Sequence, residues 1–377
     1  MKNFLNRREF LIKGGRCLSL ALPGSMGLSY IEALARPESE YYIKPALMWK
    51  KLPDKTVQCQ LCPNECRLNN GERGICRVRK NIDGSLYTLV YSRIVAAHID
   101  PIEKKPLFHF LPGSTAFSIA TAGCNLSCKF CQNWELSQSN PEDVHAVEIS
   151  PRDLSRRAKS AGTKVIAYTY NEPTVQFEYI MDSSAEARKK GLRPVIISSG
   201  YIKPQAGKML ARNLDAVKID LKAFTENFYS SICGGSLKSV LDNLVSIYST
   251  GKWLEIVVLI IPTLNDSPAE IRQMCAWVRK NLSASVPMHF TRFRSMYKIQ
   301  NLPPTPVSTL EQCCKIAKDA GIRYTYIGNV PGHKWENTWC HNCNKMLIKR
   351  SGFYHVENHI RKGLCPYCRT RIPGVWS

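Results

Sequence analysis

The sequence has few acidic residues for its size, and its basic residues are not gathered into runs. Lys and Arg number 52 against 30 Asp and Glu, which gives a formal net charge of +22. Such a charge favours an acidic partner: nucleic acid, an anionic membrane surface or an acidic substrate. However, the chain lacks any stretch of five or six consecutive basic residues and any basic–aromatic repeat. The charge alone therefore favours none of these partners over an ordinary solvated basic surface.

A long uninterrupted apolar run is also lacking near the amino terminus. Arg7-Arg8 precedes an apolar stretch of about 20 residues, which is a poor transmembrane helix because Gly, Pro, Ser and Glu32 interrupt it. An Ala-Leu-Ala motif that ends at residue 35 then offers a signal-peptidase site, with Arg36 as the new terminus. Residues 1–35 therefore resemble a twin-arginine export signal, with an ordinary basic amphipathic helix as the alternative.

Such a signal predicts export of the folded chain to the periplasm or another extracytoplasmic space. If the leader stays uncleaved, the protein is tethered to the membrane. Otherwise we expect contact with a membrane only through the export machinery. Cys17 lies within the leader but lacks the small apolar residues that precede a lipidated cysteine, so lipidation is not expected.

Sixteen cysteines are a high count for 377 residues. The length excludes a small secreted disulfide scaffold, and 44% apolar with 22% charged residues predicts a globular core. Most of the cysteines fall at metal-ligand spacings, so we interpret them as ligands. The motifs predict four segments: the leader at 1–35, an N-terminal four-cysteine module with a β-hairpin region at 36–112, a barrel at 113–330 and a zinc-ribbon-like module at 331–377.

From about residue 116 the sequence alternates β-rich runs with amphipathic segments. The expected strands are 116–123, 165–173, 193–201, 216–224, 253–262 and 286–293, with a seventh at 324–329. Several of the intervening segments open with Ser-Pro, which suits a helix N-cap and first turn. Six or seven such units predict an α/β fold with a parallel sheet, open or rolled into a barrel.

Polar groups follow several of these strands directly. They are Cys124, the "NEPT" of 171–174, the "SGY" of 199–201, Lys222, the "ND" of 265–266 and Arg292. In parallel α/β sheets, functional groups lie at the carboxyl ends of the strands. The sequence therefore predicts an enzyme site at one rim of the sheet.

The stretch "TAGCNLSCKFCQNW" at 121–134 carries Cys124, Cys128 and Cys131 in the spacing C-x3-C-x2-C. A structural zinc site and an ordinary cubane iron–sulfur cluster each take four protein ligands. Three thiolates can instead hold a 4Fe-4S cluster in which one iron has no protein ligand. An open metal position is where chemistry occurs, so the motif predicts a catalytic cluster.

This loop resembles that of the radical S-adenosylmethionine (SAM) superfamily. Together with "DPIEKKPLFHFLPGS", "YTYNEPT", "IPTLNDS", "HFTRF" and "GNVPGHKWENTWC", it makes the chain similar to the radical SAM member of the AmmeMemoRadiSam system from about residue 45 onward. That family is akin to pyruvate formate-lyase activating enzymes. Two features depart from its pattern: the twin-arginine leader, and "NEP" where "TEP" is more usual.

The resemblance implies a partial parallel (βα)6-type radical SAM barrel with small cysteine-rich metal-binding modules at its N-terminal and C-terminal sides. It implies an oxidoreductase that binds SAM at the open iron and cleaves it reductively to a 5′-deoxyadenosyl radical. That radical would abstract hydrogen from a protein or small-molecule substrate. The implied partners are a low-potential electron donor and Memo-like and AMMECR-like proteins.

The resemblance also implies roles for individual residues. The cluster ligands are Cys124, Cys128 and Cys131; Phe130 and Gln132 contact adenine or shield the cluster; Asn171 and Glu172 receive the SAM ammonium; Lys222 and His289 hold the SAM ribose or carboxylate. Two alternatives remain open. Glu172 also suits a carboxylate that starts a helix before Pro173, and His289 also suits a hydrogen-bonded core histidine.

Two further cysteine sets lie outside this loop. Cys59, Cys62, Cys66 and Cys76 are spaced C-x2-C-x3-C-x9-C, and Cys340, Cys343, Cys365 and Cys368 form two C-x2-C knuckles. The second set predicts a zinc ribbon. The first set departs from the closely spaced cysteines that bind iron–sulfur clusters in ferredoxins, so zinc is favoured there over a second iron–sulfur cluster. Disulfides are an alternative for both sets in an oxidising compartment.

The remaining cysteines, Cys233, Cys275, Cys313 and Cys314, are interpreted as buried free thiols. His341 is not expected to bind metal because four thiolates already complete its site. Two other functions are alternatives: a glycyl-radical-enzyme activase proper, and a zinc-ribbon protein that binds nucleic acid. No nucleic acid is expected, because the three-cysteine loop predicts an iron without a protein ligand, and a nucleic-acid-binding module does not need such an iron.

Overall fold

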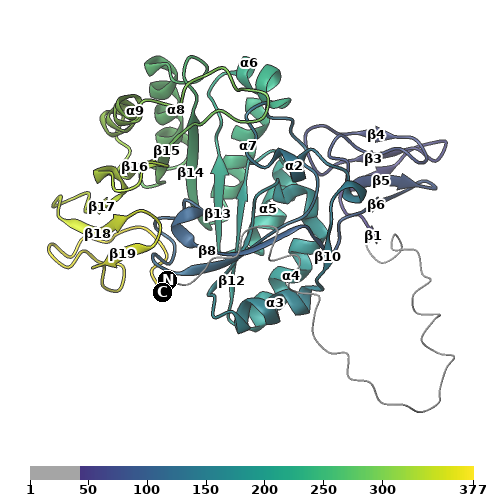
Figure 1. Cartoon of the computed structure of the whole chain (residues 1–377), viewed down its shortest axis with the longest axis horizontal. Helices are drawn as coiled ribbons and strands as arrows, with labels where there is room; N and C mark the ends of the chain where they lie inside the picture. Colours follow the sequence, from purple (N-terminus) through teal and green to yellow (C-terminus); the bar gives the residue numbers. More distant parts are fainter. Residues whose placement is uncertain (1–42) are drawn as a thin grey trace, which may run out of the picture. The chain divides into compact units, whose positions relative to one another are not determined.

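The computed structural model describes residues 43–377, so the predicted twin-arginine leader lies outside the described residues. Its centre is an eight-stranded sheet in the order β16-β15-β14-β13-β12-β11-β9-β8 (Figure 1). The strands are β8 (Ala96–Pro101), β9 (Thr115–Ala120), β11 (Val165–Tyr168), β12 (Arg193–Ser198), β13 (Ala216–Asp220), β14 (Trp253–Ile260), β15 (Met288–Arg292) and β16 (Thr325–Gly328). The seven strands from β9 to β16 run parallel, and β8 pairs antiparallel with β9 at one edge.

Helices separate the parallel strands and pack in pairs, α3 with α4, α5 with α7 and α8 with α9. Their bounds are α3 (Pro151–Ser160), α4 (Phe177–Lys189), α5 (Pro204–Arg212), α7 (Leu237–Tyr248), α8 (Pro268–Asn281) and α9 (Val307–Asp319). The Ser-Pro start is confirmed at α3, where the Ser150 hydroxyl accepts a hydrogen bond from Asp153 N at 3.1 Å and Pro151 opens the first turn. Helix α8 also begins with Pro268, but its Ser267 makes no such cap.

The strands are apolar almost throughout because both faces of the sheet are covered. On one face, Ile119, Ile166 and Val217 belong to the main core with the helices. On the other face, the neighbouring strand residues Ala116 and Ala167 pack against Ile102, Leu107, Phe110 and Leu111. The segment between β8 and β9, with the short 3-10 helix η2 (Ile102–Lys104), therefore covers the inner face near the amino ends of the strands.

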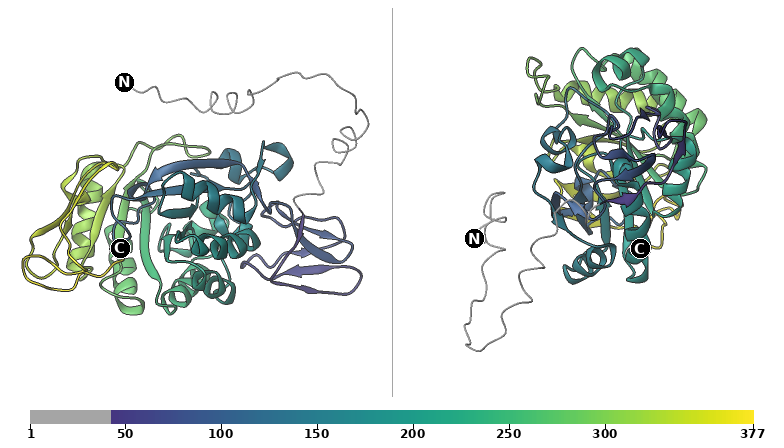
Figure 2. Two further views of the ribbon diagram at one scale, coloured as in Figure 1. Left: turned by 90° about the horizontal axis from the view of Figure 1, so that it is seen from below. Right: turned by 90° about the vertical axis from the view of Figure 1, so that its right-hand side faces the viewer.

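Small sheets flank the central one (Figure 2). On the N-terminal side, β2 (Trp49–Lys51), β3 (Val57–Cys59) and β4 (Arg67–Leu68) form one sheet, and β1 (Lys44–Pro45), β6 (Ser85–Thr88) and β5 (Arg79–Ile82) form another. The strands β7 (Arg93–Ile94) and β10 (Val147–Glu148) also pair. On the C-terminal side, the third sheet consists of β17 (Thr338–Trp339), β18 (Met346–Ser351) and β19 (His355–Asn358).

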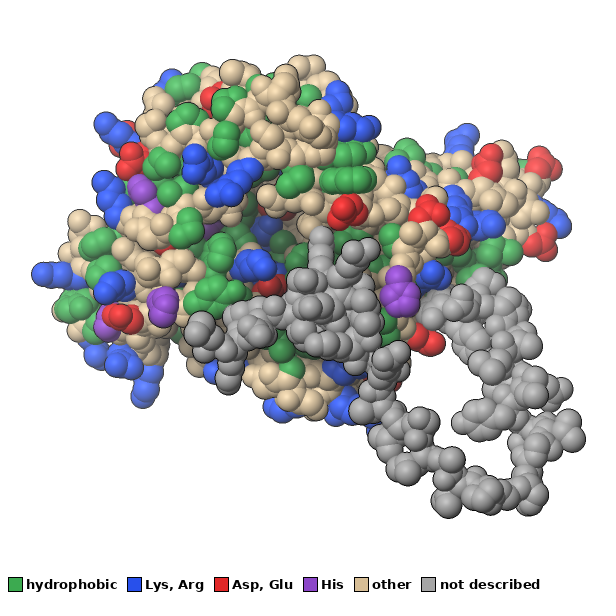
Figure 3. Space-filling view, in the orientation of Figure 1, with side chains coloured by type: hydrophobic (Ala, Val, Ile, Leu, Met, Phe, Trp, Pro, Cys, Tyr) green, Lys and Arg blue, Asp and Glu red, His purple; other side chains and the backbone are tan. Residues whose placement is uncertain are grey.

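Short helical turns fill the connections. They are α2 (Trp134–Ser137), η3 (Pro141–Asp143), η4 (Pro173–Gln176), α6 (Glu226–Phe228), the π-helical turn η5 (Tyr229–Cys233) and η6 (Lys334–Glu336). Within residues 43–377, no helix combines the length and the apolar composition that crossing a bilayer requires. On the face shown in Figure 3, Lys and Arg side chains are spread among acidic and apolar ones rather than gathered in one patch.

The α/β fold with a mostly parallel central sheet is confirmed, and all seven expected strands are present, although each is shorter than predicted. Strand β8 was not predicted; its pairing with β9 adds an antiparallel edge. The cysteine-rich parts at both ends are present as the flanking sheets. The boundaries proposed for the four segments stay a prediction.

One buried ion pair ties the N-terminal part to the barrel. Arg79 Nη2 donates to Glu178 Oε1 on α4, both side chains are 2% exposed, and Leu47 N donates to the same oxygen at 2.8 Å. We expect Glu178→Gln to destabilise the fold by about 3–5 kcal/mol, since it leaves the Arg79 guanidinium buried without its counter-charge. Urea unfolding of both variants measures this cost. Asp242→Asn, which breaks an exposed pair with Lys238, is the control and should cost about 0.5 kcal/mol or less. An equal loss in the two variants would contradict the prediction.

Candidate active site at the carboxyl rim of the sheet

The loop that follows β9 carries the three predicted cluster ligands. It turns away from the strand at Gly123, whose φ is +85° and where an added Cβ would lie 2.5 Å from Cys76 O. Only glycine therefore fits at this position. The loop is then held on η5 by two backbone hydrogen bonds, from Ser127 N to Cys233 O at 2.9 Å and from Lys129 N to Ile232 O at 3.0 Å. Cys128 is buried, whereas Cys124 and Cys131 are partly exposed.

The charges around this loop suit thiolate ligands. A hydrogen bond from the Cys233 thiol, together with the Lys222 ammonium, outweighs burial and lowers the pKa of Cys128. Burial acts against the charged form of Lys222, but Cys128 and Asp220 raise the pKa of that ammonium. Burial raises the pKa of Cys124 and of Cys131, so these two thiols would release their protons only to a metal.

Asn171 lies against the start of the same loop. Its Nδ2 donates to Gly123 O at 2.8 Å, and its side chain is buried. Its Oδ1 is also buried, and no described residue donates to it. A buried amide oxygen without a donor costs free energy, so this atom is suited to accept a hydrogen bond from a bound ligand beside Cys124.

Glu172 is held in place at the same rim by several donors. Its Oε1 accepts from Thr174 Oγ1 at 2.8 Å and from Ser198 Oγ at 2.6 Å, and its Oε2 accepts from Ser199 N at 2.7 Å and from Ser199 Oγ. It also caps η4 by accepting from Thr174 N at 3.1 Å, as a helix-starting carboxylate does. Its charge acts on Cys124, where it is the largest contribution after burial to the raised pKa. Five donors already fill this carboxylate, so Asn171 Oδ1 is the more open acceptor.

The other predicted residues divide into two groups. Phe130 is buried beside Phe228, with its ring centroid 5.6 Å from Lys222 Nζ, so Phe130 and Lys222 lie together next to Cys128. Gln132 is exposed on the surface of the loop.

His289 occupies a different environment, near the covering segment. Its Nε2 lies 2.7 Å from Glu255 Oε2, and its ring packs against Phe108 and Tyr326. Burial lowers the pKa of this imidazole. These contacts are those of a hydrogen-bonded core histidine, and its role toward SAM stays a prediction.

The C-terminal cysteines form a compact tetrad. The four sulfurs of Cys340, Cys343, Cys365 and Cys368 all lie within 4.8 Å of one another. Two of the sulfur–sulfur distances are 3.6 Å and 3.7 Å. Tetrahedral coordination with bonds of about 2.3 Å places sulfurs about 3.8 Å apart, so this tetrad fits a single metal ion. His341 Nδ1 lies 2.7 Å from Tyr324 OH, and the expectation that His341 binds no metal stays a prediction.

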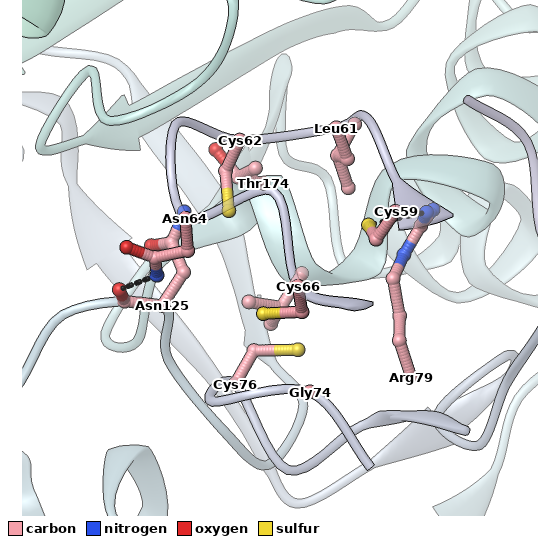
Figure 4. A pocket seen from close by; sticks show the side chains of 11 residues that line it. Cys59, Leu61, Cys62, Asn64, Cys66, Gly74, Cys76, Arg79, Asn125 and Thr174 are labelled. Atoms are coloured by element: carbon pink, nitrogen blue, oxygen red, sulfur yellow. Dashed lines mark hydrogen bonds between the residues drawn. The ribbon is translucent and has the colours of Figure 1, made fainter. Parts of the chain in front are cut away.

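The N-terminal cysteines surround a small cavity (Figure 4). Cys59, Cys62, Cys66 and Cys76 line it with Asn125, Thr174 and Arg79. Arg79 Nη1 donates to Cys59 Sγ at 3.6 Å. All fifteen cysteines of the described residues are free in this structure, and the disulfide alternative for the two tetrads stays a prediction. The predicted free thiols Cys233, Cys275, Cys313 and Cys314 are buried, as expected.

Sequence reasoning missed several residues that shape the site. It placed Ser199 at the rim but not as a donor to Glu172, and it did not single out Ser198 or Arg79. It also treated Cys233 as an ordinary buried thiol, although it lies against Cys128. Only the "SGY" at the end of a predicted strand could have indicated the serines, because the other contacts join segments far apart in the sequence.

Several known proteins are similar to this chain. Residues 118–276 match the radical SAM superfamily. The chain is 41% identical over 332 residues to an uncharacterized protein of Methanocaldococcus jannaschii, covering 88% of this chain and 99% of that protein. It is 25% identical over 187 residues to the pyruvate formate-lyase-activating enzyme of Clostridium pasteurianum, covering 48% and 71%. A radical SAM methyltransferase structure from Sphaerobacter thermophilus has 15% identity, 76% coverage of each chain and a TM-score of 0.46.

The chain therefore belongs to the radical SAM superfamily. Within that superfamily it is related to glycyl-radical enzyme activases. Superfamily members are enzymes that cleave SAM at an iron–sulfur cluster. The loop with Cys124, Cys128 and Cys131 fits such a cluster, and the unpartnered Asn171 Oδ1 fits a donor from SAM beside it.

Proposed function

We propose that this chain is an activating-enzyme-like oxidoreductase that removes a hydrogen atom from a protein or small-molecule substrate. The observation that carries the proposal is the three-cysteine loop at the carboxyl end of β9, with Asn171, Glu172 and Lys222 at the same rim. A 4Fe-4S cluster with bound SAM would supply one-electron cleavage of the sulfonium and hydrogen abstraction. The substrate would approach over this rim, where parallel α/β sheets place their ligands.

Each residue of the rim has a distinct task in this proposal. The sulfurs of Cys124, Cys128 and Cys131 would hold the cluster. Asn171 Oδ1 would accept a hydrogen bond from the SAM ammonium, while its Nδ2 donates to Gly123 O and keeps the start of the loop in position. Glu172, fixed by serine and threonine donors, supplies negative charge nearby. Lys222 and the Phe130 ring beside Cys128 would contact the polar and adenine parts of SAM.

The wider setting is also proposed. Similarity to the activating enzyme of Clostridium pasteurianum supports a glycyl-radical-enzyme activase proper as the second candidate. The motifs quoted for the AmmeMemoRadiSam system support Memo-like and AMMECR-like partners, and a low-potential electron donor is required. The twin-arginine motif at Arg7-Arg8 supports export to an extracytoplasmic space. Zinc is proposed for the C-terminal tetrad, because its sulfur spacing fits one tetrahedral ion.

Electron paramagnetic resonance (EPR) of the anaerobically purified and iron–sulfide-reconstituted protein tests the function. We expect a reduced four-iron signal that shifts when SAM is added, because SAM would bind the open iron. The measurement is made on the dithionite-reduced sample with and without SAM. A protein that contains zinc alone and gives no such signal would refute the enzyme and favour a metal-stabilised binding protein.

Asn171→Ala should weaken SAM binding about 10- to 100-fold, because it removes a buried acceptor for a charged donor. Isothermal titration of the reconstituted protein with SAM measures this change, and iron content shows whether the cluster is still held. Asn213→Ala, at the end of α5, is the control and should bind SAM as the wild type does. Unchanged affinity in Asn171→Ala would exclude the proposed acceptor.

A further inference from the structure

The two cysteine tetrads differ in the spacing of their sulfurs. The C-terminal sulfurs lie within 4.8 Å of one another, whereas no three sulfurs of Cys59, Cys62, Cys66 and Cys76 do. The three sulfurs of Cys124, Cys128 and Cys131, on the loop after β9 (the catalytic loop), do not meet this limit either. In a cubane each thiolate binds a different iron, so the sulfurs must lie farther apart than around one zinc ion. The sulfurs of the N-terminal tetrad are therefore not gathered around one point as those of the C-terminal, zinc-type site are.

The space between the N-terminal sulfurs also argues against a single zinc ion at this tetrad. The tetrad surrounds a cavity of about 20 Å³, larger than a single water molecule needs. Figure 4 shows the sulfurs of Cys62, Cys66 and Cys76 directed toward this space. Four thiolates around one zinc ion would be in van der Waals contact and would leave no such cavity. Leu61 and Val175 add apolar side chains to the lining.

The buried guanidinium group of Arg79 lies beside this tetrad. Arg79 is 2% exposed and donates to Cys59 Sγ at 3.6 Å while it is paired with Glu178. Hydrogen bonds to ligand sulfurs and nearby charge are the means by which proteins set cluster potentials. The Arg79 charge would stabilise the more negative, reduced form of a cluster at this place.

The N-terminal tetrad also lies in direct contact with the catalytic loop. Asn125, the residue after Cys124, lines the tetrad cavity, and its carbonyl accepts from Asn64 Nδ2 at 2.9 Å. On the other side of Cys124, Gly123 packs so closely on Cys76 O that a Cβ would lie 2.5 Å away. Thr174, which donates to Glu172, lines the cavity as well. Only backbone in direct contact separates Cys76 from the loop that carries Cys124.

We propose that Cys59, Cys62, Cys66 and Cys76 hold a second iron–sulfur cluster that passes electrons to the cluster on the catalytic loop. The relay step rests on the proposed function. One electron moves from a low-potential flavin or iron–sulfur protein to the tetrad cluster, and then from the tetrad cluster to the catalytic one. The donor is oxidised by one electron, the catalytic cluster is reduced by one, and the tetrad cluster returns to its starting state. No bond is made or broken and no proton is transferred.

The deciding sample is the full chain with the triple substitution C124A/C128A/C131A, purified anaerobically. We expect it to keep about four iron and about four sulfide per chain, against about eight of each in the wild type. Its dithionite-reduced EPR signal should not respond to SAM. A triple variant that binds zinc at the tetrad and no iron overturns the proposal. A SAM-shifted signal in the wild type would still support the proposed function in that case.

A second variant tests the relay. C62S/C76S should keep the SAM-sensitive signal but lose most of its rate of cluster reduction by reduced flavodoxin, while dithionite still reduces it. Cys275→Ala, a buried thiol on α8, is the control and should keep all the iron and the rate. An unchanged rate in a double variant that has lost the tetrad iron overturns the relay. If the double variant does not fold, the iron content of the triple variant decides.

Discussion

Cys128→Ala should abolish cleavage of SAM, leaving only the rate seen without enzyme. Cys128 is the central one of the three ligands, is buried, and has Lys222 and the Cys233 thiol beside it, so no water or outside thiol can easily replace its sulfur. With two thiolates left, the catalytic cluster would not be retained. Chromatography of 5′-deoxyadenosine after anaerobic incubation with SAM and dithionite measures the loss.

The matched control for this prediction is Cys313→Ala on α9. That thiol is 2% exposed, against 8% for Cys128, and it lies on α9 rather than on the three-cysteine loop, so its removal should leave cluster and rate intact. Circular dichroism of both variants would show that the barrel is folded. Retention of SAM cleavage by Cys128→Ala in a folded protein would overturn the ligand assignment.

The parallel sheet could be predicted because its strands are buried on both faces and read as short apolar runs between helices. Strand β8 could not, because Ala96–Pro101 includes the exposed His98 and Ile99 and depends on pairing with β9. The segment between β8 and β9 could be recognised in the sequence only as a family motif, and its role in covering the sheet could not be predicted. Its position on the inner face depends on contacts of Phe110 and Leu111 with residues far along the chain.

The part of the site that lies on one short segment could be predicted from the sequence. The parts that form where segments distant in the sequence come into contact could not. The spacing of Cys124, Cys128 and Cys131 indicated the catalytic loop by itself. For the N-terminal tetrad the sequence favoured zinc, because spacing alone does not reveal how far apart the sulfurs lie. The contact of Gly123 with Cys76 and the approach of Arg79 to Cys59 appear only in the folded chain, and both bear on that assignment.

Arg350 on β18 is one of the residues that join the C-terminal tetrad and its sheet to the barrel; Tyr326 OH, 2.9 Å from Thr338 Oγ1, is another. Arg350 Nη2 donates to Phe108 O at 2.7 Å, and its Nη1 donates to Thr338 Oγ1 at 2.9 Å. Its Nε lies 3.6 Å from Glu103 Oε1, and both side chains are fully buried. The sheet β17–β19 therefore supports the segment that covers the inner face of the barrel, and its own core is small.

Cys365→Ser should unfold this C-terminal sheet. A structural zinc site contributes on the order of 10 kcal/mol to folding, which the small core of β17–β19 cannot replace. We expect loss of bound zinc, protease cleavage within 331–377 and a lower unfolding temperature for the whole chain, because Arg350 would no longer hold Phe108. Mass spectrometry of metal content and of proteolytic fragments measures these changes. A chelator should reproduce them in the wild type, whereas unfolding by a thiol reductant alone would show that the tetrad is disulfide-bonded instead.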